Sequence, residues 1–358
     1  MDKTDIPAGI LESIKRGIVI PAHPLALTGE RKLDVQRQRA LTRYYLDAGA
    51  GGVAIGVHTT QFEIRAPEYD LFEPVLALAS ETVDAHPAGQ AQQVFKVAGA
   101  CGRTEQALSE AALAEETGYH ACLLSLGAMA DAELDDLIDH CRAVAEVMPL
   151  VGFYLQPSVG GRILPYEFWR EFAEIENVLA IKIAPFNRYQ TLDVVRGICE
   201  AGRAGDIALY TGNDDNIIID LLTEYRIHTS FGEQRARIVG GLLGHWAVWT
   251  RRAVEQLDRI RTIAESGGPV PPEMLTLAAQ VTDCNAAFFD PAHGYAGCIP
   301  GVHDVLRRQG LLRGIWCLNR GEVMSPGQSE EIDRVYLAYP NLNDDAFVAA
   351  HLEGWLTE

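Results

Sequence analysis

The sequence lacks the basic surplus that a nucleic-acid partner would require. Among 358 residues there are 30 Lys and Arg against 49 Asp and Glu, a formal net charge of −19. Binding to a phosphate backbone needs a basic face, so we expect no nucleic-acid partner. No uncharged apolar run approaches the ~20 residues of a membrane span, and the charged start has no apolar core of signal-peptide length. We therefore expect no membrane partner and a cytoplasmic location.

Disulfide and metal-binding patterns are also missing. The seven cysteines form no CxxC pair, and their odd number in a long chain favours reduced thiols over a disulfide framework. The ten histidines form no HExxH motif and no Cys/His cluster with zinc spacing. We expect no metal site.

Short apolar runs rich in strand-forming residues are present, and they alternate with segments of helical periodicity. In 34–49 and 103–118, apolar residues recur every three or four positions and the segment ends at Gly. Repeated strand–helix–strand units indicate parallel strands joined by right-handed crossovers, and eight units close into a (β/α)₈ TIM barrel, an α/β fold. The expected strands are 17–22, 51–57, 94–99, 121–126, 150–155, 179–184, 207–212 and 237–242.

The pattern changes near Gly244. The chain beyond it is mainly helical and is interrupted by turn-rich stretches at 266–272, 290–297 and 325–328. We predict a catalytic barrel over 1–244 and a C-terminal helical region over 245–358 packed on the barrel.

Lys182 is the charged residue in the otherwise apolar run NVLAIKIAPF, residues 177–186. Strand alternation places Ala180 and Ala184 on its face and leaves room around one long amine. Desolvation would lower the pKa of the amine and favour the neutral form, which attacks carbonyl groups. The alternative is a lysine that snorkels to the strand end or pairs with a carboxylate.

Tyr154 and the pair Thr59-Thr60 each follow or end a predicted strand, where barrel enzymes keep their chemistry. Tyr154, 28 residues before Lys182, could relay protons for an imine-forming lysine, or be a core residue with a locally satisfied hydroxyl. The threonine hydroxyls and amides could hold a carboxylate or pass a proton, or belong to ordinary β-branched residues leaving a strand.

Together these residues resemble the dihydrodipicolinate synthase / N-acetylneuraminate lyase family of class I aldolase-like enzymes. HTTQFE looks like the family's Gly-Thr-Thr-Gly-Glu turn, YLQP like Tyr-Asn-x-Pro, and NVLAIKIA like the lysine strand. TGNDD looks like the Gly-Asp turn after the seventh strand, and VGGLLGHW like the Gly-rich eighth strand. The resemblance runs over nearly the whole chain and includes the spacing from tyrosine to lysine.

The resemblance implies that Lys182 forms an imine with a 2-oxo acid, commonly pyruvate, and that no separate cofactor is needed. Tyr154 would act as acid and base, and Thr59 and Thr60 would orient the substrate carboxylate and the proton relay. The imine withdraws electrons, so that an enamine can form and attack or release an aldehyde.

Further expectations and departures concern the walls of the pocket. By the same resemblance, Gly212 and Gly241 would let the backbone approach the keto acid. Where the synthase carries an Arg after Tyr-Asn-x-Pro this chain has Val159, and Arg162 is the candidate replacement. His58 stands in place of a glycine and is either an acid/base group or a packing and hydrogen-bonding residue.

Two more departures shape the functional expectation. Gln61-Phe62 replaces the usual Gly-Glu, so we expect a reshaped pocket wall. The family's second tyrosine after the fourth strand is missing, so true dihydrodipicolinate synthase activity is disfavoured. We expect an aldolase or hydratase-aldolase that acts on a 2-oxo acid, with an aldehyde as the candidate second partner. The alternatives are a 2-oxo sugar-acid dehydratase, a synthase-like condensation through the same imine, and an inactive barrel that senses a small molecule. Oligomers are usual in the family, and we expect a homodimer or tetramer.

Overall fold

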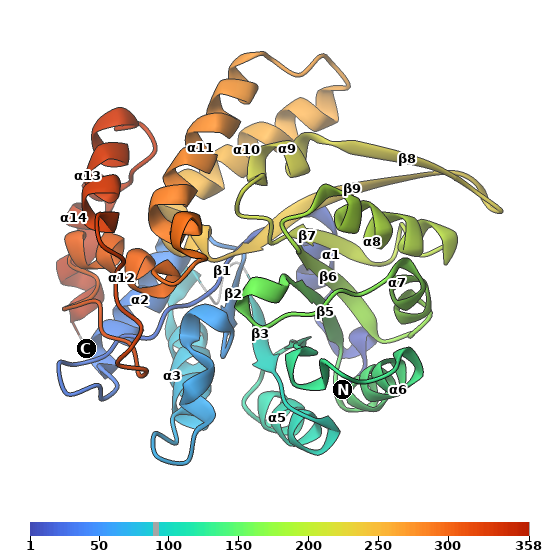
Figure 1. The fold of residues 1–358 in the computed structure, drawn as a ribbon, viewed down its shortest axis with the longest axis horizontal. Helices are drawn as coiled ribbons and strands as arrows, with labels where there is room; N and C mark the ends of the chain where they lie inside the picture. Colours follow the sequence, from blue (N-terminus) through green and yellow to red (C-terminus); the bar gives the residue numbers. More distant parts are fainter. Residues whose placement is uncertain (89–92, 358) are drawn as a thin grey trace. The chain divides into compact units, whose positions relative to one another are not determined.

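The computed structural model describes residues 1–88 and 93–357, and the chain divides into two compact units (Figure 1). The first unit comprises Met1–Ile18 and Phe95–Leu242, and the second comprises Val19–Val94 and Leu243–Glu358. We expected a division at residue 244, between a catalytic barrel and a C-terminal region. It stays a prediction, because the two units are defined by their compactness and do not show which part is catalytic.

Six parallel strands form the sheet of the first unit, in the spatial order β9-β7-β6-β5-β4-β3. β3 to β7 are mainly apolar runs buried on both faces, as strands covered by crossover helices must be, whereas β9 is polar and largely exposed in its first half and buried towards its end. In chain order the six strands are β3 (Phe95–Ala100), β4 (Ala121–Leu124), β5 (Leu150–Leu155), β6 (Val178–Ala184), β7 (Ala208–Thr211) and β9 (Gly232–Leu243).

Helices alternate with these strands, and neighbouring helices pack side by side (Figure 1). Asn187 shows how one of them begins: its side chain accepts the Tyr189 N–H at 2.9 Å and so caps α8. The helices of this unit are α1 (Ala8–Arg16), α5 (Thr104–Glu116), α6 (Leu134–Val147), α7 (Tyr166–Ala173), α8 (Arg188–Glu200) and α9 (Ile217–Leu222).

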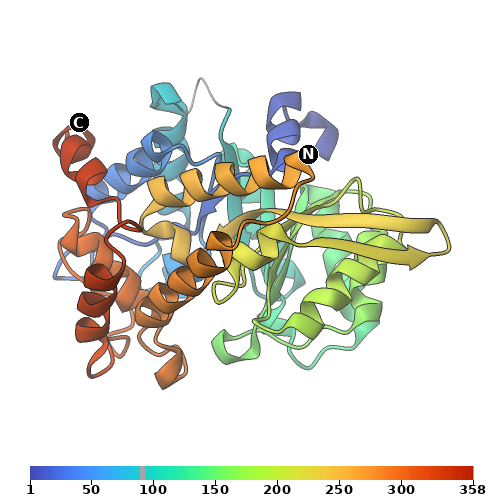
Figure 2. The same ribbon diagram turned by 90° about the horizontal axis from the view of Figure 1, so that it is seen from above.

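A β-hairpin that sequence reasoning missed precedes the last strand. β8 (Glu224–Thr229) pairs antiparallel with the first residues of β9, so that the last predicted strand begins at Gly232 and not near residue 237. Two residues connect the strands, and Gly232 has φ +87°, a conformation that glycine adopts without strain. The alternation in EYRIHT is the signal that could have found it. Figure 2 shows the hairpin as a long two-stranded ribbon.

The second unit contains the first two strands and most of the helices at the C-terminal end. β1 (Val19–Pro21) and β2 (Gly52–Ile55) lie next to each other, with a parallel bridge between Ala22 and Ala54. The helices are α2 (Val35–Ala48), α3 (Phe72–Ala85), α10 (Thr250–Ser266), α11 (Glu273–Phe289), α12 (Cys298–Arg308), α13 (Gln328–Ala338) and α14 (Asp345–Leu356).

Helix α2 connects the early and late segments of this unit. It packs against α3, α10 and α14. The buried Tyr44 hydroxyl donates to Asp344 at 2.8 Å and accepts the Thr250 N–H at 2.8 Å, while Tyr45 donates to the Ala247 carbonyl at 3.0 Å. The C-terminal helices are therefore fastened to the α2 segment by buried hydrogen bonds.

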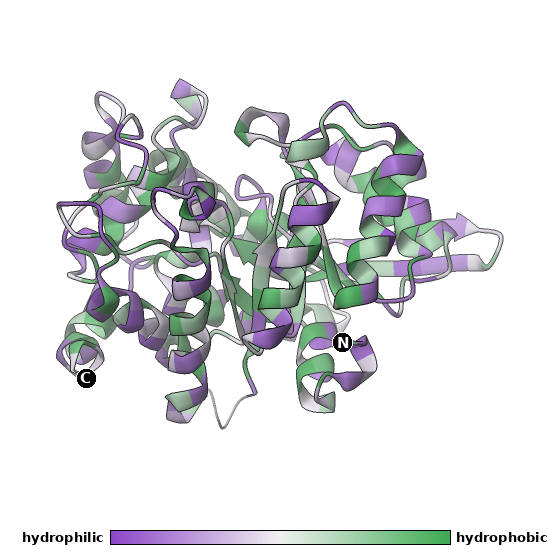
Figure 3. Ribbon diagram, turned by 90° about the horizontal axis from the view of Figure 1, so that it is seen from below, coloured by the Kyte–Doolittle hydropathy of each residue, from purple (hydrophilic) through white to green (hydrophobic). Residues whose placement is uncertain are grey.

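In chain order, the described residues form eight parallel strands, β1 to β7 and β9, that alternate with helices, and β8 is added to β9 by the hairpin; five further helices follow, which is the (β/α)₈ TIM barrel with a C-terminal helical extension that the sequence predicts. All eight predicted strands are present, within a few residues of their expected bounds apart from the early start of the last. Hydrophobic residues concentrate on the strands in Figure 3. Within the described ranges, every helix is too short or too polar to cross a bilayer.

Candidate functional site

Lys182 lies in the interior of β6 and is 8% exposed. Its register neighbours are Phe153 on β5 and Tyr210 on β7, and its Nζ lies 4.5 Å from the centre of the Phe153 ring. In the described part of the chain, Nζ has no hydrogen-bond or ion-pair partner. Burial lowers the pKa of the amine to about 8, although the negative charge of Asp214 opposes the shift. A carboxylate is thus close enough to act electrostatically, but it does not neutralise the amine by direct pairing.

Gly212 leaves the space that the lysine stem occupies. A Cβ at position 212 would lie 2.7 Å from Lys182 Cε and 2.7 Å from Ala184 Cβ, far inside van der Waals contact. The Gly212 N–H donates to the Ile183 carbonyl at 2.7 Å and so holds the turn against β6. The structure brings Gly212 and Lys182 together, and the alanine beside them provides part of the room, as strand alternation predicts.

A buried carboxylate organises this turn, and sequence reasoning missed it. Asp220 in α9 accepts the Thr211 hydroxyl at 2.8 Å and the Asn213 side-chain amide at 2.9 Å through one oxygen. Arg188 Nη1 and the Asn216 amide reach the other oxygen at 3.0 and 2.7 Å. Because each partner comes from the TGNDDN stretch or from α8, Asp220 determines the path of the backbone that packs on Lys182.

Gly241 and its neighbour lie on β9 beside β7. Gly241 is paired with Thr211, and its N–H donates to the Ile18 carbonyl at 3.3 Å. The crowded position is Gly240, where a Cβ would meet the Ile18 carbonyl oxygen at 2.6 Å and the Tyr210 ring at 2.7 Å. The close approach between Gly241 and a keto acid stays a prediction.

Tyr154 lies on the strand next to Lys182, as predicted, but its side chain is not directed at the amine. Phe153 is the residue in register with Lys182, and successive side chains of a strand point to opposite faces. Tyr154 instead packs on Trp169 of α7, with ring centres 5.2 Å apart, and its oxygen accepts the Leu164 N–H at 3.2 Å. Burial raises the pKa of the phenol. Its acid/base role stays a prediction.

Arg162 is occupied with backbone oxygens. Its Nη1 donates to the carbonyls of Met129 at 2.6 Å and Ala132 at 3.0 Å, which ties the loop after β5 to the loop after β4. Gly127 lets these loops approach, because a Cβ there would lie 2.5 Å from the Gly160 oxygen. Substrate binding by Arg162 stays a prediction. Its guanidinium connects the two loops, a structural role that the position of Arg162 in the sequence did not suggest.

Thr59 and Thr60 belong to a single turn of 3-10 helix, His58–Thr60, in the second unit. The Thr59 hydroxyl donates to the Ala22 carbonyl and the Thr60 hydroxyl to the His23 carbonyl, both at 2.7 Å. Thr60 Oγ1 also accepts the Gly56 and Val57 N–H groups at 3.0 and 3.3 Å. Both hydroxyl protons are therefore used to hold the turn to the end of β1.

His58, at the start of this turn, is half-buried. Its ring lies 6.1 Å from the Phe62 ring. The contact agrees with a packing role and does not decide between that role and acid/base chemistry.

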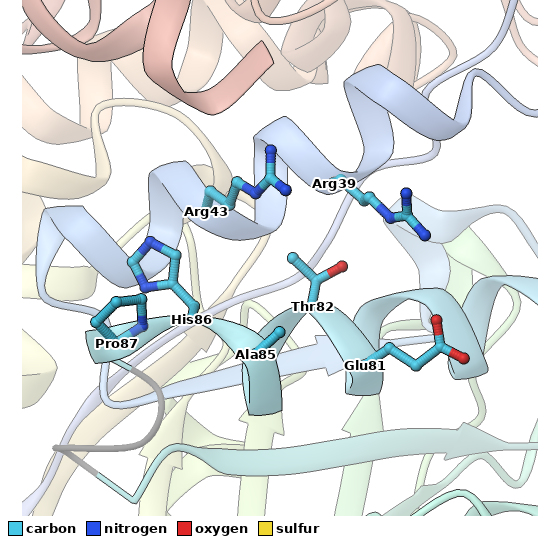
Figure 4. Close-up of a pocket in the computed structure, with 7 residues that line it drawn as sticks. All are labelled: Arg39, Arg43, Glu81, Thr82, Ala85, His86 and Pro87. Atoms are coloured by element: carbon cyan, nitrogen blue, oxygen red, sulfur yellow. The ribbon is translucent and has the colours of Figure 1, made fainter. Parts of the chain in front are cut away.

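Two cavities are lined by residues other than the predicted site residues. One of about 380 Å³ lies between α2 and α3 and is lined by arginines and a histidine (Figure 4). Two of these side chains contact neighbouring groups: Arg43 donates to the Trp355 and Thr357 carbonyls at the end of α14, and His86 Nε2 lies 3.5 Å from Asp47. A second cavity, of about 520 Å³, is lined by residues of 103–104, 128–132 and 136–140.

Metal binding has no visible donor set in the described ranges, where no group of three or more His, Cys, Asp or Glu side chains is arranged to hold an ion. Whether the protein acts without a metal or a cofactor stays a prediction.

The structure is thus an α/β barrel with a buried lysine on β6, beside a glycine turn. The profile of the dihydrodipicolinate synthetase family matches residues 16–223, more than half of the chain. The protein belongs to this family.

Solved structures share the fold at low sequence identity. Dihydrodipicolinate synthase from Oceanobacillus iheyensis has a TM-score of 0.72 at 14% identity, covering 93% of this chain and 99% of that one. N-acetylneuraminate lyase from Fusobacterium nucleatum has 0.69 at 13%, covering 91% and 99%. YagE, a prophage protein of E. coli K12 solved in complex with pyruvate, has 0.70 at 14%, covering 90% and 97%. No curated protein sequence matches the chain.

The packing around Gly212 gives a direct test of the lysine environment. We expect Gly212→Ala to lower the free energy of unfolding by about 1–3 kcal/mol, because the added methyl group overlaps the Lys182 stem and the Ala184 methyl. Urea denaturation at pH 7 measures the change. Gly205→Ala is the control, since a Cβ there has open space around it. Equal stability of both variants would contradict the close packing.

Proposed function

We propose that the protein is a Schiff-base lyase of the aldolase or hydratase-aldolase type, acting through Lys182 on a 2-oxo acid such as pyruvate. The observation that supports this most is the buried amine itself, with no hydrogen-bond acceptor in the described residues and a pKa lowered to about 8. A structural lysine is normally paired when buried, whereas a nucleophilic one must be available as the free base. Family membership and the pyruvate complex of YagE support the same chemistry.

The reaction begins with the lone pair of neutral Lys182 on the carbonyl carbon of the 2-oxo acid. The carbonyl oxygen takes up a proton and the attacking nitrogen gives one up, which forms the carbinolamine; protonation of its hydroxyl group and loss of water then give the protonated imine. Loss of a proton from the adjacent carbon then gives an enamine, which adds to an aldehyde or, in reverse, is left when an aldehyde departs. An amine pKa of about 8 leaves part of the lysine neutral near pH 7, and this neutral form is the nucleophile.

Tyr154 is the proposed acid/base for these proton transfers. Its oxygen accepts the Leu164 N–H, so the phenolic proton itself has no acceptor among the described residues. The ring faces α7, and catalytic hydrogen bonds are commonly completed only once substrate is bound. The family resemblance assigns the carboxylate of the 2-oxo acid to the turn of Thr59 and Thr60, and backbone approach to Gly212 and Gly241.

The imine is tested by trapping with borohydride. We expect incubation with pyruvate, or with another member of a panel of 2-oxo acids, to give a reduced adduct that peptide mass spectrometry places at Lys182, and Lys182→Met to abolish it. Lys96 is a matched control, because it too is a buried strand lysine of the first unit. Labelling of Lys96 and Lys182 alike would indicate nonspecific reaction, and no adduct at Lys182 with any acid would contradict the mechanism.

The charge of Asp214 gives a test based on pH. Asp214 stabilises the ammonium form, so Asp214→Asn should move the pKa of Lys182 further below about 8. The neutral amine would then be available at lower pH, and the midpoint of the rate of adduct formation against pH should shift to a lower value. Asp215→Asn is the control in the same turn, because Asp215 faces Arg188 and not the lysine. An unchanged midpoint would show that Asp214 does not act on Lys182, and an upward shift would contradict the stabilisation of the ammonium form.

Tyr154→Phe distinguishes a proton relay from a core residue. Loss of the relay should slow adduct formation about 10²–10⁴-fold, the usual worth of general acid–base catalysis. The same change removes one hydrogen bond to the Leu164 N–H, so the unfolding free energy should fall by about 1–3 kcal/mol. Samples trapped with borohydride at successive times measure the rate of adduct formation, and urea denaturation measures the free energy of unfolding. A full rate with reduced stability would leave Tyr154 as a structural residue.

Screening separates the finer possibilities. With an adduct established, aldehyde acceptors and sugar acids offered to the enzyme distinguish an aldolase from a dehydratase, and aspartate semialdehyde tests the synthase-like condensation.

A further inference from the structure

A segment of the C-terminal region is fastened to the loops that follow β1 and β2 in the second unit. We call residues 315–322, between α12 and α13, the strap. Arg31 Nε donates to the Cys317 carbonyl at 2.7 Å, and the Tyr69 hydroxyl donates to the Leu318 carbonyl at 3.1 Å. Both strap residues are 1% exposed. The strap is therefore a buried, hydrogen-bonded part of the second unit and not a loose connection.

Gln61 makes the shortest of these connections. Its Oε1 accepts the Leu318 N–H at 2.6 Å, and the side chain is 1% exposed. A backbone N–H can only donate, so the amide oxygen must face it and the orientation of the side chain is settled. Its Nε2 is buried without an acceptor among the described residues. A buried donor without an acceptor destabilises the fold. The bond from Leu318 to Gln61 is present in spite of this cost, which indicates that it has a role in the structure.

The backbone of Gln61 is strained. Its φ is +69°, in the left-handed region that residues with a side chain rarely adopt. A glycine would adopt this conformation freely, and glycine is what the resembled turn carries at this place. A non-glycine residue persists in such a conformation only when its surroundings hold it there. Here the side chain that causes the strain is the one that the strap holds.

Gln61 directly follows the threonine turn and closes it. Its N–H donates to the His58 carbonyl at 2.9 Å, and the Thr60 N–H donates to the Val57 carbonyl at 2.9 Å. A displacement of Gln61 would therefore move the end of the turn and the hydroxyl of Thr60. The strap reaches the turn from more than 250 positions further along the chain.

We infer that Gln61 is a positioning residue: by bonding the strap it fixes the turn of Thr59 and Thr60, so that the C-terminal region contributes to the grip on the substrate carboxylate. The inference rests on the proposed function, in which this turn binds the carboxylate of the 2-oxo acid. In this interpretation the strap holds the turn in place. The bond to the strap is also the reason for a glutamine at position 61, where glycine would adopt the same backbone conformation with less strain.

The first part of the test does not depend on any substrate. Hydrogen exchange of the peptide containing residues 57–62 is compared among the wild type, Gln61→Gly, Gln61→Ala and Tyr69→Phe. Loss of one buried hydrogen bond should speed exchange of the turn amides about tenfold in both Gln61 variants and by less in Tyr69→Phe, which keeps the ring. Arg320→Ala is the control, since it changes an exposed strap residue outside these bonds.

The second part measures binding against chemistry. Borohydride trapping at Lys182 over a range of pyruvate concentrations should show a half-saturating concentration raised about tenfold in the Gln61 variants, with the rate at saturation within about threefold of the wild type. Circular dichroism confirms that each variant is folded, and Gln61→Gly, which relieves the backbone strain, guards against misfolding.

Failure of this inference and failure of the proposed function give different results. Wild-type behaviour of Gln61→Gly in both measurements would overturn the inference, because the side chain and the strap would then be dispensable. Faster exchange with an unchanged half-saturating concentration would also overturn it, since the turn would not bear on binding. If the wild type gives no adduct with any 2-oxo acid while exchange responds as expected, the proposed function fails, and the strap is left as a support of the turn without a role in substrate binding.

Discussion

The buried, unpaired amine of Lys182 is the feature of the first unit on which the packing of the residues around it depends. Lowering the pKa of a lysine from 10.5 to about 8 corresponds to about 3 kcal/mol of lost stabilisation of its charged form. This is the net loss after the negative charge of Asp214 has offset part of the desolvation, and the face of the Phe153 ring, 4.5 Å from Nζ, attracts the ammonium form through its quadrupole. The absence of a side chain at Gly212 leaves room for the lysine stem. Each feature keeps the amine buried, unpaired and able to react.

The turns that follow the strands are held by short polar side chains whose hydrogen-bonding groups are used internally. Asp220 gathers donors from the turn after β7 and from α8, and Arg162 joins two neighbouring loops through carbonyls. In the second unit, the threonine hydroxyls fasten the His58–Thr60 turn to the end of β1. Rigid turns of this kind suit a site whose backbone must meet a small acid, because loops that move freely position atoms poorly.

Features that follow a repeated sequence pattern were predicted from the sequence, whereas contacts made by individual side chains were not. The strands were found because buried parallel strands are continuous apolar runs, and Lys182 stood out because a charge interrupts one of them. The hairpin of β8 was missed because its alternation covers six residues in a place where a crossover helix was expected. The direction of Tyr154, the carbonyls bound by Arg162 and the bond between Gln61 and Leu318 depend on partners 10, 30 or more positions away, which no local pattern encodes.

By itself, the sequence determined the α/β barrel class, the strand that carries the lysine, the small residues around it and the family to which the chain belongs, because periodicity and motif spacing are local properties. Tertiary structure alone decided the rest: that Phe153 and not Tyr154 lies beside the amine, that Asp220 organises the glycine turn, and that the strap bonds a strained Gln61. The physical reason is that strand register, burial and side-chain direction arise only when segments distant in the chain pack together, and these three quantities set both the pKa of Lys182 and the position of the turns.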